Sequence, residues 1–80
     1  MADPFLGEIK LFAIPYAPVN YALCDGLPMP ISQYSTLFQV IGNKFGGDGQ
    51  TTFQLPDLRP ITPNYMTYYI CHEGIYPSVY

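Results

Sequence analysis

The chain has 80 residues, of which 49% are hydrophobic and 11% are charged, with eight tyrosines, five phenylalanines and a formal net charge of −3. This length predicts one small domain over residues 1–80, and such a domain buries only about 60% of the surface that its unfolded chain exposes. The cations Lys10, Lys44 and Arg59 are too few to neutralise a run of phosphates, which excludes nucleic-acid binding and a basic membrane-binding surface.

Neither a membrane span nor a secretion signal is indicated. The longest apolar stretch, residues 11–24, is interrupted by Pro15, Pro18 and Asn20, so it is too short and too broken to cross a bilayer. Residues 1–5 lack the positive charges and the apolar run of a conventional signal peptide. Export by cell lysis or by a dedicated secretion machine is left open.

The first predicted element is a β-strand within residues 5–14. Glu8 and Lys10 alternate there with Ile9 and Leu11, so that polar side chains point one way and apolar side chains the other. This alternation is typical of a half-buried strand.

A loop and a second strand follow. Pro15 and Pro18 predict an extended loop, because proline neither continues a helix nor donates to a sheet ladder. Residues 21–24 read as a short strand, and Asp25-Gly26 indicates a tight turn. The prolines in residues 28–30 stiffen the chain after that turn.

One α-helix is predicted, with Ser32 as its N-cap and Gly42 just beyond its last apolar residue. Between them one apolar stripe recurs at helical spacing, which predicts a helix packed on the first two strands. The stripe consists of Tyr34, Leu37, Phe38 and Ile41.

The next segments read as a glycine-rich turn over residues 45–50 and a short strand over residues 51–55. The turn lacks the Lys-Ser/Thr ending of a phosphate-binding loop. Asp57 and Arg59 are expected to form an ion pair, or Asp57 to cap backbone amides of the turn. After an extended stretch the aromatic residues 65–71 predict a last strand. Together these elements predict an α+β fold, a small domain of short β-strands with one α-helix packed on them.

The two cysteines, Cys24 and Cys71, admit two interpretations. A disulfide between them would close a long loop and stabilise the fold by about 4 kcal/mol, whereas two free buried thiols would act as small apolar side chains. The sequence does not identify the redox compartment, so both stay open.

The single histidine, His72, is a weak candidate for chemistry. Its neighbour Cys71 would point to the opposite face of a strand, which does not suit a nucleophile–base pair. One histidine with one or two thiols could bind zinc, but four well-spaced ligands are not evident. A redox or metal protein built on these residues and Cys24 is the minor alternative. We expect no enzymatic activity, no metal and no cofactor.

Several segments in fixed order resemble one known family. The most specific are Gly46-Gly47-Asp48-Gly49 and Leu55-Pro56-Asp57-Leu58-Arg59, preceded by Phe5-Leu6-Gly7-Glu8-Ile9 and Ala22-Leu23-Cys24-Asp25-Gly26. Over residues 5–59 the order and spacing resemble the phage tail-collar domain, which also occurs in microcystin-dependent-type proteins of bacteria. Residues 64–80 resemble the family's C-terminal strand and its ending. The chain looks like a minimal form, because the family's usual long insert between these two parts is missing and no fibre shaft precedes the collar core.

The resemblance and the composition together predict a non-enzymatic structural protein that self-associates into an extracellular or phage-tail-like fibre or filament. So few charged residues cannot cover the surface of a solitary domain, which favours contacts with copies of itself over a monomer with an apolar surface. The last strand, following the hinge at residues 60–64, is a candidate for donation to a neighbouring copy. The alternative function is attachment to a cell-surface glycan at the tip of a tail fibre. The candidate self-association residues are Tyr65, Tyr68, Tyr69, Ile70, Ile75, Tyr76 and Tyr80.

Overall fold

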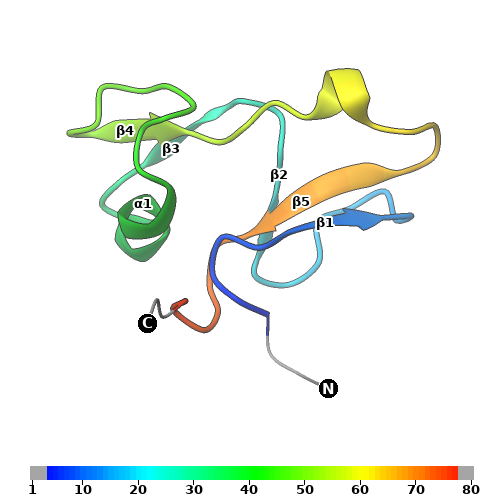
Figure 1. Cartoon of the computed structure of the whole chain (residues 1–80), viewed down its shortest axis with the longest axis horizontal. Helices are drawn as coiled ribbons and strands as arrows, with labels where there is room; N and C mark the ends of the chain where they lie inside the picture. Colours follow the sequence, from blue (N-terminus) through cyan, green and yellow to red (C-terminus); the bar gives the residue numbers. More distant parts are fainter. Residues whose placement is uncertain (1–3, 78–80) are drawn as a thin grey trace.

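Two small antiparallel sheets and one α-helix share a single core in the computed structural model, which describes residues 4–77 (Figure 1). A three-stranded sheet has the order β1-β5-β2, and a two-stranded sheet pairs β3 with β4. This arrangement is compatible with the predicted α+β class. In chain order the elements are β1 (Ile9–Phe12), β2 (Tyr21–Leu23), β3 (Pro28–Pro30), α1 (Ser35–Ile41), β4 (Thr52–Gln54), the 3₁₀-helix η1 (Arg59–Ile61) and β5 (Thr67–Cys71).

The last strand, β5, lies at the centre of the three-stranded sheet. Ile70 is opposite Ile9 of β1 on one side and opposite Ala22 of β2 on the other. Aromatic and β-branched residues favour such a strand, and the Ile70 side chain is fully buried. The three-stranded sheet therefore closes only when the end of the chain pairs with its beginning.

An aromatic cluster fixes the loop between β1 and β2 on one face of this sheet. The Phe12 ring contacts the rings of Tyr21 and Tyr69 edge-on, with centroids 5.4 and 5.7 Å apart. The Tyr69 hydroxyl donates a hydrogen bond to the Ile14 carbonyl at 3.3 Å, which ties the loop to the central strand. Side-chain pairs of this kind are the main stabilising contacts across short strands.

The core joins both sheets to α1. Its buried residues are Leu6, Cys24, Leu37, Phe53, Leu55 and Ile70. The helix contributes Leu37, which is fully buried, and Phe38, whose ring lies 5.4 Å from that of Phe53 in β4. The predicted stripe thus faces the core, and β4 provides one of its partners, where we had expected only the first two strands.

The helix starts later than predicted and ends where predicted. Ser32 is not its N-cap, because the Tyr34 N–H donates to the carbonyls of Pro30 and Ile31 and makes a separate turn before the helix. At the other end the Gly42 N–H donates to Phe38 O at 2.7 Å, with φ at 62°. Glycine adopts this left-handed conformation without strain, which makes it a favourable helix terminator.

Strand β3 and the 3₁₀-helix η1 were not predicted. The prolines of β3 argue against a strand, but β3 has β4 on one side only, and an edge strand accepts proline where the N–H would face outward. Its central residue, Met29, lies opposite Phe53. Pro60 occupies the first turn of η1, where no N–H is needed.

The glycine-rich segment after α1 is a turn, as predicted, and Asp48 organises it. One Asp48 oxygen accepts the backbone N–H groups of Gln50, Thr51 and Thr52 at 2.8–2.9 Å, and the other accepts the Thr51 hydroxyl at 2.7 Å. These bonds, the one from Thr52 above all, hold the pKa of Asp48 far below its usual range. A Cβ at Gly47 would lie 2.5 Å from Phe53 Cα, so the turn needs glycine there.

Truncating the helix side chain in the core tests this packing. Leu37→Ala is expected to lower the free energy of unfolding by about 2–5 kcal/mol, because the change leaves a cavity next to Phe53 and Ile70. Urea denaturation followed by circular dichroism measures the loss. The control is Val19→Ala, at a side chain that is 85% exposed, and it should stay within about 0.5 kcal/mol of the unmodified chain. Equal effects of both changes would contradict this core.

Candidate functional site

The structure separates the candidate self-association residues into exposed and buried ones. Tyr65, Tyr76 and Ile75 are 97%, 53% and 46% exposed. Tyr69 and Ile70, in contrast, are buried within the domain at 3% and 0% exposure. We therefore correct their assignment: they cannot contact a neighbour while the sheet is intact. Tyr68 is half-buried against the core, and Tyr80 lies outside the described residues.

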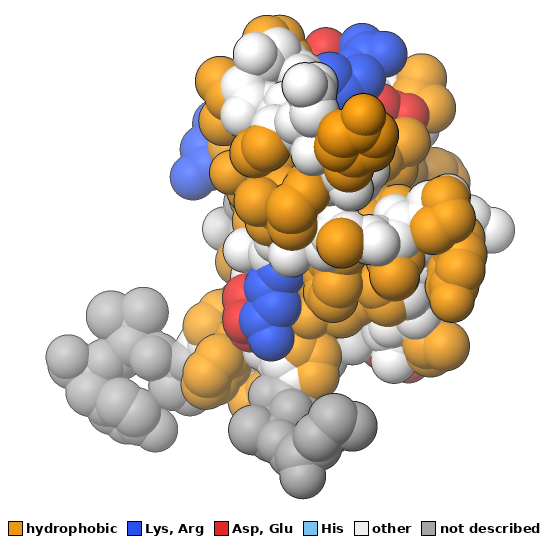
Figure 2. All heavy atoms as spheres, turned by 90° about the vertical axis from the view of Figure 1, so that its right-hand side faces the viewer, with side chains coloured by type: hydrophobic (Ala, Val, Ile, Leu, Met, Phe, Trp, Pro, Cys, Tyr) orange, Lys and Arg blue, Asp and Glu red, His pale blue; other side chains and the backbone are white. Residues whose placement is uncertain are grey.

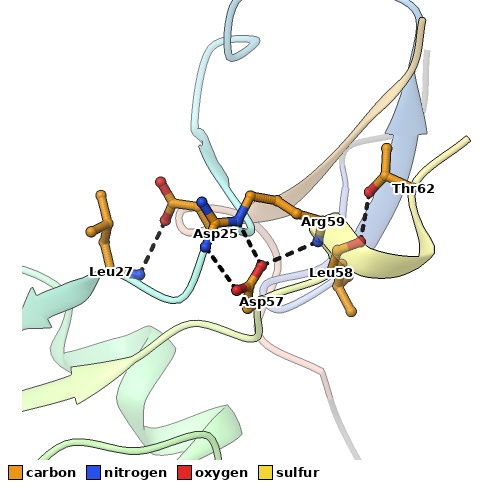
Figure 3. Close-up of polar contacts among 6 residues, drawn as sticks. All are labelled: Asp25, Leu27, Asp57, Leu58, Arg59 and Thr62. Carbon is orange, nitrogen blue, oxygen red and sulfur yellow. Dashed lines mark hydrogen bonds and ion pairs between the residues drawn. The ribbon is translucent and has the colours of Figure 1, made fainter. Parts of the chain in front are cut away.

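Tyr65 lies in the connection between β4 and β5, which we define as residues 59–66. A polar cluster anchors the start of this connection (Figure 3). One Asp57 oxygen accepts Arg59 N–H groups from the backbone at 3.2 Å and from Nε at 2.8 Å, and the other accepts Nη2 at 2.8 Å. Asp57 thus forms the predicted ion pair and also the predicted backbone cap. The Arg59 side chain and backbone bonds lower the pKa of Asp57 to about 2.

Two further contacts join this cluster to the rest of the fold. The Leu58 N–H donates to Cys24 O at 3.1 Å, next to the bridge that pairs Asp25 with Asp57. The Thr62 hydroxyl donates to Leu58 O at 2.6 Å, across the turn of η1 (Figure 3). The connection is therefore held at its base by both carboxylate and backbone bonds.

At the far end of the connection the backbone of Tyr65 adopts a positive φ of 68°. For a bulky residue this left-handed conformation is uncommon and costs energy, so surrounding structure must impose it. Pro60 and Pro63 restrict the chain before it, and the Met66 N–H donates to Pro63 O at 3.3 Å. The result is a tyrosine ring held out into solvent.

The connection contributes to an apolar face of the molecule. Figure 2 shows the side to which the connection points in Figure 1, and hydrophobic side chains cover most of it, with only small groups of charges. A hollow of about 400 Å³ runs along the connection and reaches Leu23 and Tyr68. This surface is our candidate functional site.

Two exposed side chains that the sequence analysis passed over share one signal. Tyr16 and Ile61 are 67% and 66% exposed, and each lies in a short segment between two prolines. Prolines keep such a segment out of sheet ladders, so a large apolar side chain there finds few partners within the domain. That pattern could have been recognised in the sequence.

The two cysteines are free and buried. The sheet register explains why they do not pair. Cys71 lies opposite Tyr21, and Cys24 comes three residues after Tyr21, so the Cα atoms of the two cysteines are offset by about 10 Å along the strands, beyond the Cα separation of a disulfide. The structure therefore favours the free-thiol interpretation over the disulfide. Burial raises the pKa of Cys24 to about 11.

His72 packs against Tyr34, the residue just before α1. Its ring lies 5.2 Å from the Tyr34 ring in an edge-on arrangement, while the Cys71 thiol donates to Glu73 O at 3.3 Å. Within residues 4–77 no three side chains of His, Cys, Asp or Glu come together as a metal site. No helix in that range has the length and apolarity to traverse a bilayer.

Comparison with known proteins identifies the family. The model of the Phage Tail Collar Domain matches residues 7–63, well over half of the chain. The chain belongs to this family. Collar domains are structural domains of phage tails and are not known for enzymatic activity. No curated protein and no solved structure gives a significant match.

Acid unfolding tests the ion pair of this collar domain. Because the folded pKa of Asp57 is about 2 and its ordinary value 3.8, the bond to Arg59 stabilises the fold fully above about pH 5 and is lost as the pH falls toward 2. Arg59→Met should therefore lower the melting temperature at pH 6 and have little effect at pH 2. Thermal melts at both values measure this. An equal decrease in melting temperature at both pH values would contradict the ion pair.

The thiols offer a second test. Both should react slowly with a thiol reagent in the folded chain and fully in denaturant, because burial hides the sulfurs and raises the pKa of Cys24. Titration of free thiols and intact mass measure the outcome. A chain that loses two hydrogens under mild oxidation while keeping its native circular dichroism would overturn the register given above.

Proposed function

We propose that this collar domain is a non-enzymatic structural subunit that self-associates into a tail fibre or a similar extracellular filament. The supporting observation is the distribution of its apolar side chains. In residues 4–77 the structure buries eight hydrophobic residues and leaves eleven large ones exposed. The exposed ones are Phe5, Ile9, Tyr16, Val19, Leu23, Leu27, Phe45, Ile61, Tyr65, Ile75 and Tyr76.

So much exposed apolar surface is typical of proteins that associate. Tyrosine in particular is enriched at interfaces, because its ring covers area while its hydroxyl keeps a hydrogen-bond partner. Covering these side chains with those of a second copy would remove them from water at a gain of about 25 cal/mol for each Å² of apolar surface.

Association of intact subunits has better support than association in which each subunit donates its last strand to a neighbour. β5 already pairs with β1 and β2 of its own chain, and its residues Tyr69, Ile70 and Cys71 are buried. Donation would have to break both ladders and remove these side chains from the core before any new contact forms. Association through side chains that are already exposed has no such cost.

Attachment to a cell-surface glycan is the second candidate. The hollow along the connection combines Tyr65 and Tyr68 with polar groups, as sugar sites do. Two of those polar groups, however, already have partners within the subunit, since Arg59 bonds to Asp57 and the Thr62 hydroxyl bonds to Leu58. Self-association therefore has the stronger support.

Sedimentation velocity over a hundredfold range of concentration tests the proposal. The unmodified chain should form larger species as the concentration rises, and electron microscopy should show fibres. Ile61→Lys places a charge on the apolar face and should weaken association about tenfold or more, as expected for an interface that loses about 1.4 kcal/mol. Gln39→Lys, on the exposed side of α1, is the matched control and should associate normally.

A chain that stays monomeric at the highest concentration, folded and soluble, would rule the proposal out. Equal association of the Ile61→Lys variant would leave self-association standing and exclude the apolar face around the connection.

A further inference from the structure

We propose that the subunits join head to tail, with Tyr65 of one copy inserted into a hollow of the next copy next to Glu73. The inference rests on the self-association proposed above and specifies its contact. The hollow measures about 300 Å³ and is lined by Pro4, Asn20, Glu73, Gly74 and Ile75.

The Tyr65 side chain is exposed and available for binding. The Tyr65 side chain is 97% exposed, so it gives up almost no contact within its own subunit when it binds another. Its positive φ is imposed by a connection that Asp57, Arg59 and the η1 turn hold in place. Strained residues that surrounding structure holds in place cluster at binding and switch sites. A tyrosine side chain also loses little conformational freedom on binding, because it has only two rotatable χ angles.

The hollow has the chemistry that a phenol needs. Pro4 and Ile75 supply apolar walls, and they are fixed to each other because the Ile75 N–H donates to Pro4 O at 3.0 Å. Ile75 is 46% exposed and so has apolar surface left to cover. A Cβ at Gly74 would lie 2.5 Å from Pro4 O, which shows how closely these walls pack.

One polar group in the hollow has no partner in the described part of the chain. The Glu73 side chain is exposed and makes no hydrogen bond or ion pair within residues 4–77. A carboxylate accepts hydrogen bonds, and the tyrosine hydroxyl donates one. The ring and the hydroxyl of Tyr65 would thus both find their complement, the ring against Ile75 and the hydroxyl at Glu73.

The two parts of the contact lie at opposite ends of β5. Tyr65 precedes the strand and Glu73 follows it, and the four steps of β5 that lie between them already span about 13 Å at the rise of a strand. Figure 1 shows the connection at the upper right and the segment after β5 at the lower left. A subunit therefore cannot fill its own hollow. Repeating the contact adds copies in one direction, which excludes a symmetric pair and builds an open filament unless the rotation between copies closes a ring.

The test uses two complementary variants of the full chain. Tyr65→Asn removes the ring, and asparagine accepts a positive φ more readily than tyrosine, so the fold should be at least as stable as before. Glu73→Lys removes the acceptor and fills the hollow from a position that makes no side-chain bond of its own. Each variant alone should associate about 30-fold more weakly, or worse, than the unmodified chain, the effect of losing a central interface residue.

Mixing the two variants gives the decisive result. The Glu73→Lys copy keeps its Tyr65, and the Tyr65→Asn copy keeps its hollow, so one intact contact forms and both remaining ends are blocked. We expect a one-to-one pair in sedimentation velocity and in native mass spectrometry, and no longer species. Gln39→Lys is the control for added charge, and thermal melts check that every variant is folded.

Other outcomes overturn the inference in distinguishable ways. If the unmodified chain never associates, the proposed function fails with it. If it associates and both variants do so equally well, self-association stands and the head-to-tail contact is wrong. If only Tyr65→Asn abolishes association while Glu73→Lys does not, the ring binds elsewhere, for example against the hollow beside its own connection in a symmetric pair, and the assignment to Glu73 is wrong.

Discussion

The double pairing of β5 is the constraint on which the rest of this collar domain depends. Ile70 is the residue where β1, β5 and β2 meet, and it is also part of the core that reaches Leu37 of α1 and Phe53 of β4. The strands on either side of it have only four and three residues, too short to form a stable sheet alone. The domain folds as a unit because its last strand completes both ladders at once. The family match ends at residue 63, so this strand lies outside the matched region and still organises it.

Much of this architecture could be predicted from the sequence, because local rules and the tertiary structure agree. β1, β2, β4 and β5 lie within the segments that alternation and aromatic content predicted, and α1 ends at Gly42 as its terminator indicated. The Gly-Gly-Asp-Gly turn and the Asp57–Arg59 pair are also where the motifs placed them, since both depend on contacts between residues close in sequence.

The features that could not be predicted depend on which element lies next to which. β3 is a strand only because β4 supplies a partner on the side that its prolines leave free. The separation of Cys24 from Cys71 follows from the register of β2 on β5, and sequence spacing carries no information about register. For Tyr69 and Ile70 a signal was present. The unbroken apolar run of residues 68–71 is typical of a strand buried on both faces, and it was interpreted as an interface instead.

The apolar surface of the domain follows from how its few charges are used. Asp25, Asp48, Asp57 and Glu8 each accept a backbone N–H and shape a turn or the start of a strand. Lys10 and Arg59 in turn lie within 3.2 and 2.8 Å of carboxylates from this same group. Charged side chains that are bonded within local structure are not spread over the whole surface, where they would keep two molecules from associating. In a chain whose strands are short and whose loops are long, turns need such bonds, and the consequence is a domain with a face that carries only small groups of charges (Figure 2). Among the acidic residues of the described chain Glu73 is the exception, because its carboxylate makes no bond within residues 4–77, and we therefore propose it as the acceptor for a neighbouring copy.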